Sequence, residues 1–400
     1  MIELITTLIT IGAVLGGTLG TCSYLIYVER KLSAFMQDRV GPNRVGPYGL
    51  FQPLADGLKF LLKEDIIPDH VNKVMFLIAP TISVFTTLLA FSVVPFGDVN
   101  TSFKWQDLPI ISSFVPESWQ TADVLRFLVA PNVDIGIVFI FAITSLAVYG
   151  IILGGWASNN KYSALGSLRA SAQVVSYEIP LGMSVLGIAL MAGTLNLESV
   201  MGKQTSSIFA WNIWYQPLAC LIFFTAALAE SNRMPFDLPE CEQELVGGYH
   251  TEYSALKFAL FFLGEYTHVV TVSFLTVILF FGGWHLPFIA EANLDANSTS
   301  ILMILVKLGV LMLKVFLVIV FIMLLRWTIP RFRFDQLMGL AWKVMIPLSM
   351  ANVVVVMTIK QFGISQWWLL PISLALFGAA GAIGVATKQA ELNQRSVTTH

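Results

Sequence analysis

The sequence predicts an all-α protein, a polytopic bundle of about nine membrane-spanning helices. Of the 400 residues, 56% are hydrophobic and only 12% are charged, and the mean hydropathy is +0.75. A soluble domain usually carries about 25% charged residues, so this composition excludes a water-soluble globule. Apolar stretches of roughly 20 residues, the length that a helix needs to cross a bilayer, also recur along the whole chain.

The apolar stretches define the predicted spans. They run over residues 4–28, 74–96, 135–157, 174–192, 213–230, 255–284, 301–325, 344–359 and 364–387. Helices are expected because a segment in lipid must satisfy its own backbone hydrogen bonds. The first stretch exceeds a signal-peptide core and lacks a small-residue cleavage pattern, so we expect it to be retained as a span. No linker, low-complexity tract or repeat separates the spans, and residues 1–400 are expected to form one integral membrane domain.

The distribution of Lys and Arg predicts the orientation. Nine spans place the chain ends on opposite sides, and 16 of the 23 basic residues fall on the side of the C-terminus and the odd-numbered loops. Only 4 fall on the other side, and the remaining three lie within spans. Because basic residues concentrate on the cytoplasmic face, we expect the N-terminus outside and the C-terminus inside.

Cysteine and histidine give no sign of a metal or disulfide framework. Cys22, Cys220 and Cys241 are scattered, and the five histidines show no ligand spacing. The sequence therefore predicts no zinc site and no iron–sulfur cluster in this chain. Nothing in it points to nucleic acid.

The first loop combines turns with an amphipathic segment. The Gly-Pro steps at Gly41 and Gly46 predict turns. From Phe51 to Lys63, leucines recur at helical spacing on one face, whereas Asp56 and Lys59 lie on the other. This pattern predicts an interfacial helix on the cytoplasmic side. Two interpretations stay open: a helix that simply lies on lipid, and one that frames a portal between lipid and a cavity.

A second loop is strongly acidic. Between residues 230 and 252 a single base, Arg233, faces six acids, which are Glu230, Asp237, Glu240, Glu242, Glu244 and Glu252. Carboxylates crowded beside a low-dielectric membrane cannot all ionise, so some are expected to hold protons, as a proton relay requires. The alternative is a solvated acidic loop. The apolar neighbours in this segment favour burial.

Ionisable residues also interrupt three of the spans. Glu178 and Glu265 extend the acidic pattern into the membrane, and Lys257 is a conceivable partner for Glu265. Lys307 and Lys314 are seven residues apart and share a helix face. These two lysines either form ion pairs with internal acids or mark a polar track. Charges inside a span usually mark function.

The seventh loop places Arg326, Arg331 and Arg333 within eight residues. Anchoring by positive charge on the cytoplasmic side would suffice to explain them. The aromatic residues between them and Asp335 favour the docking of another protein.

Several segments carry a specific resemblance. They include Glu29-Arg30-Lys31, the run from Gln37 to Pro47, Trp156 to Tyr162, Ser176-Tyr177-Glu178, Ala229 to Glu240, Glu244 to Tyr249, and Pro330 to Arg333. In this order they resemble the H subunit, mitochondrial subunit 1, of respiratory complex I, the NADH:quinone oxidoreductase.

The resemblance implies a proton-translocating complex in which this chain binds no redox cofactor. A quinone, ubiquinone or menaquinone, is its substrate, and NADH, FMN and iron–sulfur clusters belong to peripheral-arm partners, with further membrane-arm subunits alongside. The quinone tunnel would include Arg30, Arg39, Phe51, Asp56 and Lys59. The proton channel would include Glu178, Glu230, Asp237, Glu240, Glu242, Glu244, Glu252 and Glu265. Charge balance and docking would fall to Arg233, Arg326, Arg331 and Arg333.

Two features qualify the resemblance. The segment over residues 97–132 is longer than in compact mitochondrial relatives, which favours a bacterial inner membrane over a mitochondrial one. His268 stands where a smaller residue is usual, as a possible extra titrating group. The alternatives are the related subunit of a membrane-bound hydrogenase or of a ferredoxin- or F420-linked dehydrogenase. A stand-alone cation transporter would instead predict broken helices and an inverted repeat.

Overall fold

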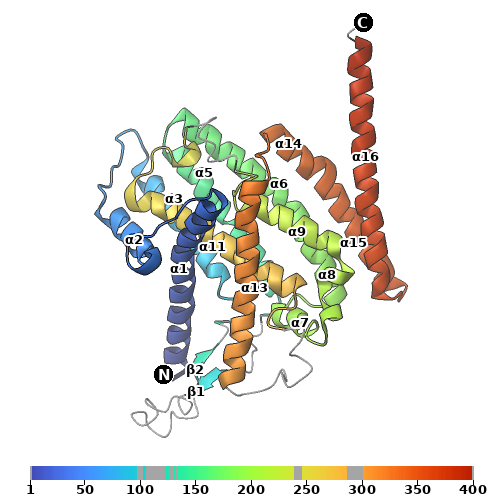
Figure 1. The fold of residues 1–400 in the computed structure, drawn as a ribbon, viewed down its shortest axis with the longest axis horizontal. Coiled ribbons are helices and arrows are strands. Elements are labelled where there is room, and N and C mark those ends of the chain that lie inside the picture. The colour runs from blue at the N-terminus through green and yellow to red at the C-terminus, as the bar shows by residue number, and fades with distance from the viewer. Residues whose placement is uncertain are drawn as a thin grey trace.

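The computed structural model describes residues 2–96, 102–104, 123–126, 129–130, 133–237, 246–285 and 301–398, and these form a helical bundle (Figure 1). The first half contains α1 (Ile2–Met36), α2 (Gln52–Leu62), α3 (Lys73–Ala90), α4 (Gly136–Ser145), α5 (Ala147–Ala157) and α6 (Lys161–Ala192). The second contains α7 (Leu197–Gly202), α8 (Asn212–Tyr215), α9 (Pro217–Glu230), α11 (Ala255–Phe280), α13 (Ile301–Thr328), α14 (Phe334–Gly339), α15 (Ile346–Gln361) and α16 (Leu369–Thr398). Short helical turns are η1 (Pro47–Gly49), η5 (Ile208–Ala210), η6 (Gly248–His250), η7 (Leu340–Met345) and η8 (Gln366–Trp368).

The predicted polytopic helical bundle is confirmed. Among the described residues, seven helices are long and apolar enough to cross a membrane. Two shorter apolar helices, Pro217–Glu230 and Gln366–Ala382, fall where two further spans are predicted. The one departure from an all-helical chain in the described ranges is an antiparallel pair of strands, β1 (Ser102–Lys104) and β2 (Asp123–Arg126), inside the long segment after α3.

Several helices extend beyond the predicted spans. The helix α1 runs to Met36, eight residues past the predicted end, and α6 begins at Lys161 rather than at residue 174. A charged residue ends the stretch that can lie in lipid. It does not end the helix, because Glu, Arg and Lys are good helix formers. The extra turns carry charged residues of both signs into the bundle.

The ends predicted to share the cytoplasmic side point the same way. The last turns of α1 and α13, the helix α14 and the far end of α16 lie in the upper half of the view in Figure 1, whereas α1 starts at the bottom. Helix α16 stands at the edge of the bundle and projects beyond it.

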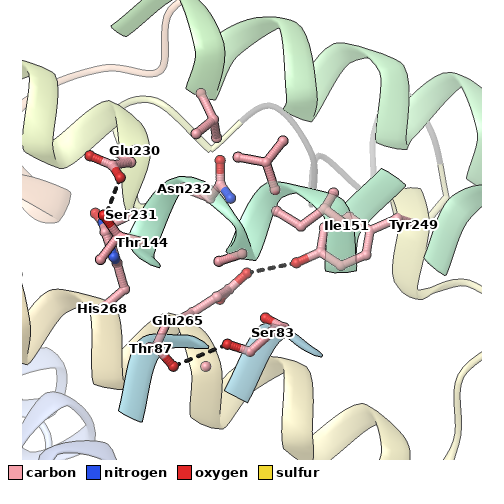
Figure 2. Close-up of a pocket in the computed structure, with 14 residues that line it drawn as sticks. Ser83, Thr87, Thr144, Ile151, Glu230, Ser231, Asn232, Tyr249, Glu265 and His268 are labelled. Atoms are coloured by element: carbon pink, nitrogen blue, oxygen red, sulfur yellow. Dashed lines mark hydrogen bonds and ion pairs between the residues drawn. The ribbon is translucent and has the colours of Figure 1, made fainter. Parts of the chain in front are cut away.

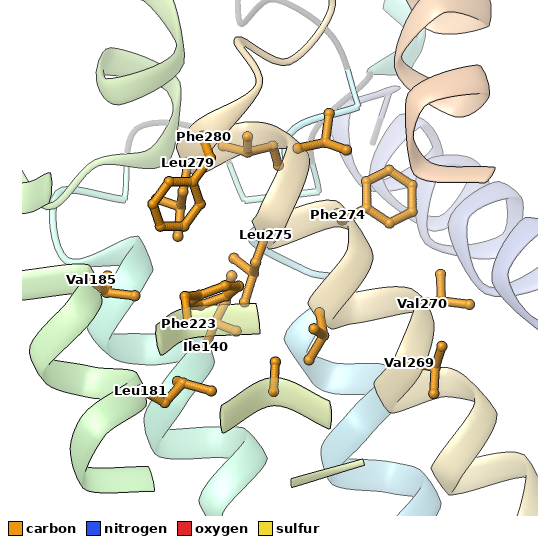
Figure 3. Close-up of a cluster of buried hydrophobic side chains, with 14 of the residues drawn as sticks. Ile140, Leu181, Val185, Phe223, Val269, Val270, Phe274, Leu275, Leu279 and Phe280 are labelled. Carbon is orange, nitrogen blue, oxygen red and sulfur yellow. The ribbon is translucent and has the colours of Figure 1, made fainter. Parts of the chain in front are cut away.

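Helix α11 forms the centre of the bundle. Every residue from Gly264 to Phe280 is buried, and the helix packs against α1, α3, α9 and α13. In Figure 3, Leu275, Leu279 and Phe280 of α11 lie on the side of Phe223 of α9 and Leu181 of α6, whereas Val269, Val270 and Phe274 lie on the other side of α11. Its buried hydroxyls bond back to its own turns, as Thr271 does to the Thr267 carbonyl at 3.0 Å. These hydroxyls therefore sit in the core with their hydrogen bonds satisfied.

Glycines permit the closest approaches near the middle of the bundle. A Cβ on Gly264 of α11 would lie 2.8 Å from Ser83 Oγ on α3. A Cβ on Gly166 of α6 would lie 2.7 Å from the Gly248 Cα in η6. Small residues at such contacts let membrane helices pack tightly, where apolar burial gives little driving force between helices.

The predicted amphipathic segment is a helix, α2, within one residue of the expected bounds at each end. Its leucine face is exposed, with Leu54, Leu58 and Leu61 each more than half accessible. Two ion pairs hold the helix and the chain that follows it. Arg30 of α1 contacts Asp56 at 2.7 Å, and Lys257 of α11 contacts Asp65 at 2.7 Å. The apolar face is therefore left free of the bundle, as an interfacial helix requires.

Candidate functional site

Five charged and polar groups from four segments meet inside the bundle. Glu29 of α1 accepts a 2.5 Å hydrogen bond from the Tyr266 hydroxyl of α11 and also bonds Arg326 of α13. Arg233, in the turn after α9, lies 3.9 Å from Glu29 and 3.9 Å from Glu265. Its guanidinium covers the Tyr266 ring at 4.1 Å. Two buried acids thus share one arginine, which balances charge that would otherwise be costly in a low-dielectric interior.

A small polar cavity continues from this cluster. It has a volume of about 40 Å³, and Glu230, Asn232, Tyr249, Glu265 and His268 contribute to its lining. In Figure 2 Glu265 points toward Tyr249, whose hydroxyl donates to Oε1 at 3.1 Å, and Glu230 points toward His268. A buried water needs roughly 10–15 Å³ of such space and several polar partners, so the cavity has room for water.

Glu178 of α6 lies beyond Glu230. It is half-buried and interacts electrostatically with Glu230. It also lines a second, larger cavity between α4 and α6. The acids Glu29, Glu265, Glu230 and Glu178 therefore follow one another through the interior, with Arg233 between the first two.

The turn after α9 is held in place by buried contacts. Gln173 of α6 donates hydrogen bonds of 2.7 Å to the carbonyls of Ala229 and Phe236. The Phe236 ring stacks on Phe332 with centroids 5.5 Å apart. Arg331 contacts Asp237 at 3.2 Å. Arginines predicted for charge balance thus lie beside acids, and the start of the acidic loop is fixed rather than solvated.

The residues predicted for the quinone tunnel do not all come together in one cluster. Arg30 and Asp56 join α1 to α2, and Gln52 donates to the other Asp56 oxygen at 3.0 Å. Arg39, Phe51 and Lys59 are exposed. Arg39 donates to the neighbouring Gln37 side chain at 2.7 Å. The structure brings Arg30 and Asp56 together and leaves the others on the outer surface of the loop and of α2.

Other predicted residues lie apart. Glu252 accepts a 2.7 Å hydrogen bond from Asn160 at the start of α6 and does not line the polar cavity. Arg333 is exposed at the start of α14. Glu240, Glu242 and Glu244 lie outside the described residues.

Two suggestions for the internal lysines need correction. Lys257 does not pair with Glu265: it bonds both Asp65 oxygens, at 2.8 and 2.7 Å. Lys314 forms no ion pair with an acid in the part of the chain described. It donates to the carbonyls of Phe281, Gly283 and His285, at 2.8, 2.9 and 2.6 Å, where α11 ends. A cation there stabilises unsatisfied carbonyls and the negative end of the helix dipole.

Sequence reasoning misses Glu29 and Tyr266 as members of the cluster. Glu29 follows directly on an apolar run that ends at Val28, so it falls just outside the predicted span. The available signal is the absence of any helix-stopping residue between Val28 and Met36. Tyr266 adjoins Glu265, but its partner is 237 residues away.

Two histidines outside the spans, His250 and His285, favour the neutral form. Burial lowers the pKa of His250 to about 3, where the ring packs against Tyr249 and Phe261. Burial, and then the nearby Lys314 charge, lower the pKa of His285. No cluster of metal-ligating side chains occurs among the described residues.

Comparison with known proteins places this arrangement in a family. A sequence model described as NADH dehydrogenase matches residues 9–357. An H subunit of the NADH-quinone oxidoreductase of Cytophaga hutchinsonii is 44% identical over 347 residues, which cover 87% of this chain and 94% of the relative. This chain belongs to the H-subunit family of NADH-quinone oxidoreductase.

Further relatives named as H subunits agree. The one from Koribacter versatilis is 45% identical over 354 residues, covering 88% of this chain and 96% of the relative. The one from Leptospira biflexa is 46% identical over 327 residues, covering 81% and 86%. The matches span nearly the whole of each relative. The matched region therefore runs from α1 to α15 and includes the internal acids Glu29, Glu265, Glu230 and Glu178.

Proposed function

We propose that this chain is the membrane subunit of a proton-translocating NADH-quinone oxidoreductase that guides quinone out of the lipid and couples its reduction to proton movement. The observation that carries the proposal is the row of internal acids, Glu29, Glu265, Glu230 and Glu178. They reach from the end of α1 to the middle of α6. Ionisable groups inside a membrane bundle are costly and usually lie on ion or proton paths.

The geometry suits transfer of protons rather than storage of fixed charge. Arg233 lies 3.9 Å from an oxygen of Glu29 and 3.9 Å from an oxygen of Glu265, near the outer limit of an ion pair with either. The polar cavity beside Glu265 and Glu230 has room for water that would bridge them. Carboxyl groups separated by water and hydroxyls pass protons by short steps, with no large motion of the backbone. We propose that Asp237, Glu240, Glu242, Glu244 and Glu252 continue this path toward the cytoplasmic side.

The quinone side of the proposal rests on α2. Its exposed leucine face and its attachment through Arg30 and Asp56 place an amphipathic helix beside the end of α1. The Glu29 carboxylate, one residue before Arg30, belongs to the acidic cluster. A quinone that enters beside α2 would therefore be reduced close to the first acid of the path. Because reduction to a quinol takes up protons as well as electrons, the two processes share their starting point.

Electron carriers are assigned to partners. We propose that NADH, FMN and iron–sulfur clusters are held by peripheral subunits, which dock at the cytoplasmic surface around Arg331 and Arg333, and that other membrane-arm subunits complete the complex. Quinone is then the substrate that this chain handles. The bacterial relatives favour a bacterial inner membrane.

Replacing Glu230 with Gln tests the acidic path. The amide keeps size and hydrogen bonding and removes titration. The complex should assemble and oxidise NADH with an artificial electron acceptor at the normal rate, while NADH:quinone reductase activity falls by about 100-fold, a typical contribution of a proton-transferring group. Asp134→Asn, the same kind of change at an exposed site before α4, is the matched control. Normal quinone reductase activity in assembled Glu230→Gln complex would overturn the proposal.

A further inference from the structure

We infer that His268 is a proton-carrying partner of Glu230, which makes the path in this chain a mixed carboxyl and imidazole path. The inference rests on the proposed function and adds a residue to it. His268 lies on α11, three residues after Glu265, so both side chains share the helix face that meets the cavity.

The His268 and Glu230 side chains face one another but lie slightly too far apart for a hydrogen bond. His268 Nε2 lies 3.7 Å from Glu230 Oε1 (Figure 2). That distance is too long for a hydrogen bond but suits a shared water or a shift of less than about 1 Å. His268 is only 8% exposed, and among the described residues Nε2 has no hydrogen-bond partner. A buried polar atom that faces a cavity with room for water, and has no partner, is a place for a water or a proton.

Asn232 supplies an independent sign of water at the same place. Its Oδ1 is also buried without a hydrogen-bond partner in the described parts of the chain, and Asn232 lines the same cavity. Water in the cavity would satisfy the Asn232 oxygen and the His268 nitrogen together. The cavity then joins Glu230, His268 and Glu265 into one hydrogen-bonded group.

The surroundings favour an exchange of protons over a fixed charge. Helices α3 and α4 offer only the hydroxyls of Ser83, Thr87 and Thr144 to the cavity. Other ionisable groups are Glu265 on α11, Tyr249 in η6, and Glu178 on α6. Behind Glu265 lie Arg233, Glu29 of α1 and Arg326 of α13. No base in the described chain contacts Glu230 other than His268.

The proton balance of the step is simple. Protonated Glu230 donates its proton, directly or through one water, to neutral His268 Nε2, which leaves a carboxylate beside an imidazolium. The net charge is the same before and after, but two neutral groups become two charges, and the transfer is feasible because the carboxylate and the imidazolium form beside one another as an ion pair. The reverse step returns the proton to Glu230.

The test compares His268→Gln, Glu230→Gln and the double variant in the assembled complex, with the exposed histidine change His70→Gln as the control. Assembly is measured by NADH oxidation with an artificial acceptor, and function by quinone reductase rate and proton uptake into vesicles. His268→Gln should lower the coupled rate by about 10-fold, within the range of coupling between contacting residues. The double variant should be no slower than Glu230→Gln alone.

The pH dependence of the coupled rate distinguishes a proton-carrying histidine from a purely structural one. The ratio of native to His268→Gln rates should change with pH, because only the native complex has the titrating imidazole. If His268→Gln fails to assemble, the smaller His268→Asn takes its place in the same comparison. Native rates, or a ratio that is constant with pH, would overturn the inference.

The outcomes separate the inference from the function on which it rests. Loss of activity in Glu230→Gln with native behaviour in His268→Gln removes only the role of His268. Native activity in Glu230→Gln removes the proposed function itself.

Discussion

Arg233 is expected to be the residue on which the buried acids most depend. Its side chain is 15% exposed, and the two carboxylates that it faces, on Glu29 and Glu265, are 12% and 8% exposed. Two unit charges about 4 Å apart interact by roughly 4 kcal/mol at an effective dielectric constant of about 20. Removing one partner of a buried ion pair typically costs about 3–5 kcal/mol. Because Arg326 still contacts Glu29, we place the cost of Arg233→Gln at about 3 kcal/mol, mostly at Glu265.

The assay is the amount of complex in membranes and its resistance to thermal inactivation after solubilisation. Arg233→Gln should reduce both, and adding Glu265→Gln should restore part of the loss, because the uncompensated charge is then gone. Arg44→Gln is the matched control. Arg44 is exposed in the first loop, so the loss of its charge should cost less than about 1 kcal/mol. Equal effects of Arg233→Gln and Arg44→Gln, or no recovery in the double variant, would refute this reasoning.

Three further predictions concern other parts of the chain. The pair of Arg30 and Asp56 is partly exposed, so Arg30→Ala or Asp56→Ala should change stability by less than about 1 kcal/mol. Both variants should nevertheless lower quinone reductase activity and leave the activity with an artificial acceptor intact. Loss of assembly would show a structural role instead. His250 is neutral in the folded chain with a pKa of about 3, so unfolding takes up a proton below about pH 6.5. Stability should therefore fall on acidification by up to about 1.4 kcal/mol per pH unit, and His250→Phe should flatten this dependence of thermal inactivation, unlike His70→Gln. Lys314→Met should remove three hydrogen bonds at the end of α11 and cost roughly 2–3 kcal/mol, whereas Lys314→Arg, which keeps the donors, should cost less in the same assay.

The sequence was sufficient for the features that depend on local pattern. Apolar length predicted the bundle, and helical spacing predicted α2 to within one residue at each end. The apolar neighbours of the acidic segment over residues 230–252 indicated burial, and the contacts of Gln173 and Arg331 hold its described start, from Glu230 to Asp237, against the bundle.

The sequence could not supply what depends on distant segments. The partner of Lys257 is Asp65, 192 residues away, whereas the sequence suggested the nearer Glu265. Glu29 meets Arg326 across 297 residues, and its place in the cluster depends on how α1 and α13 pack against α11. His268 appears in the sequence only as an unusual residue. Its position opposite Glu230 follows from the packing of α9 on α11.

The central claim is that the internal acids couple quinone reduction to proton movement. Its most direct test is the rate of quinone reduction and of proton uptake, measured together in sealed vesicles with Glu230→Gln complex, using Asp134→Asn as the control. Asp134→Asn should reduce quinone and pump normally. Glu230→Gln, despite full assembly and normal reaction with an artificial acceptor, should lose both quinone turnover and proton uptake. Vesicles in which assembled Glu230→Gln complex reduces quinone and pumps protons at native rates would contradict it.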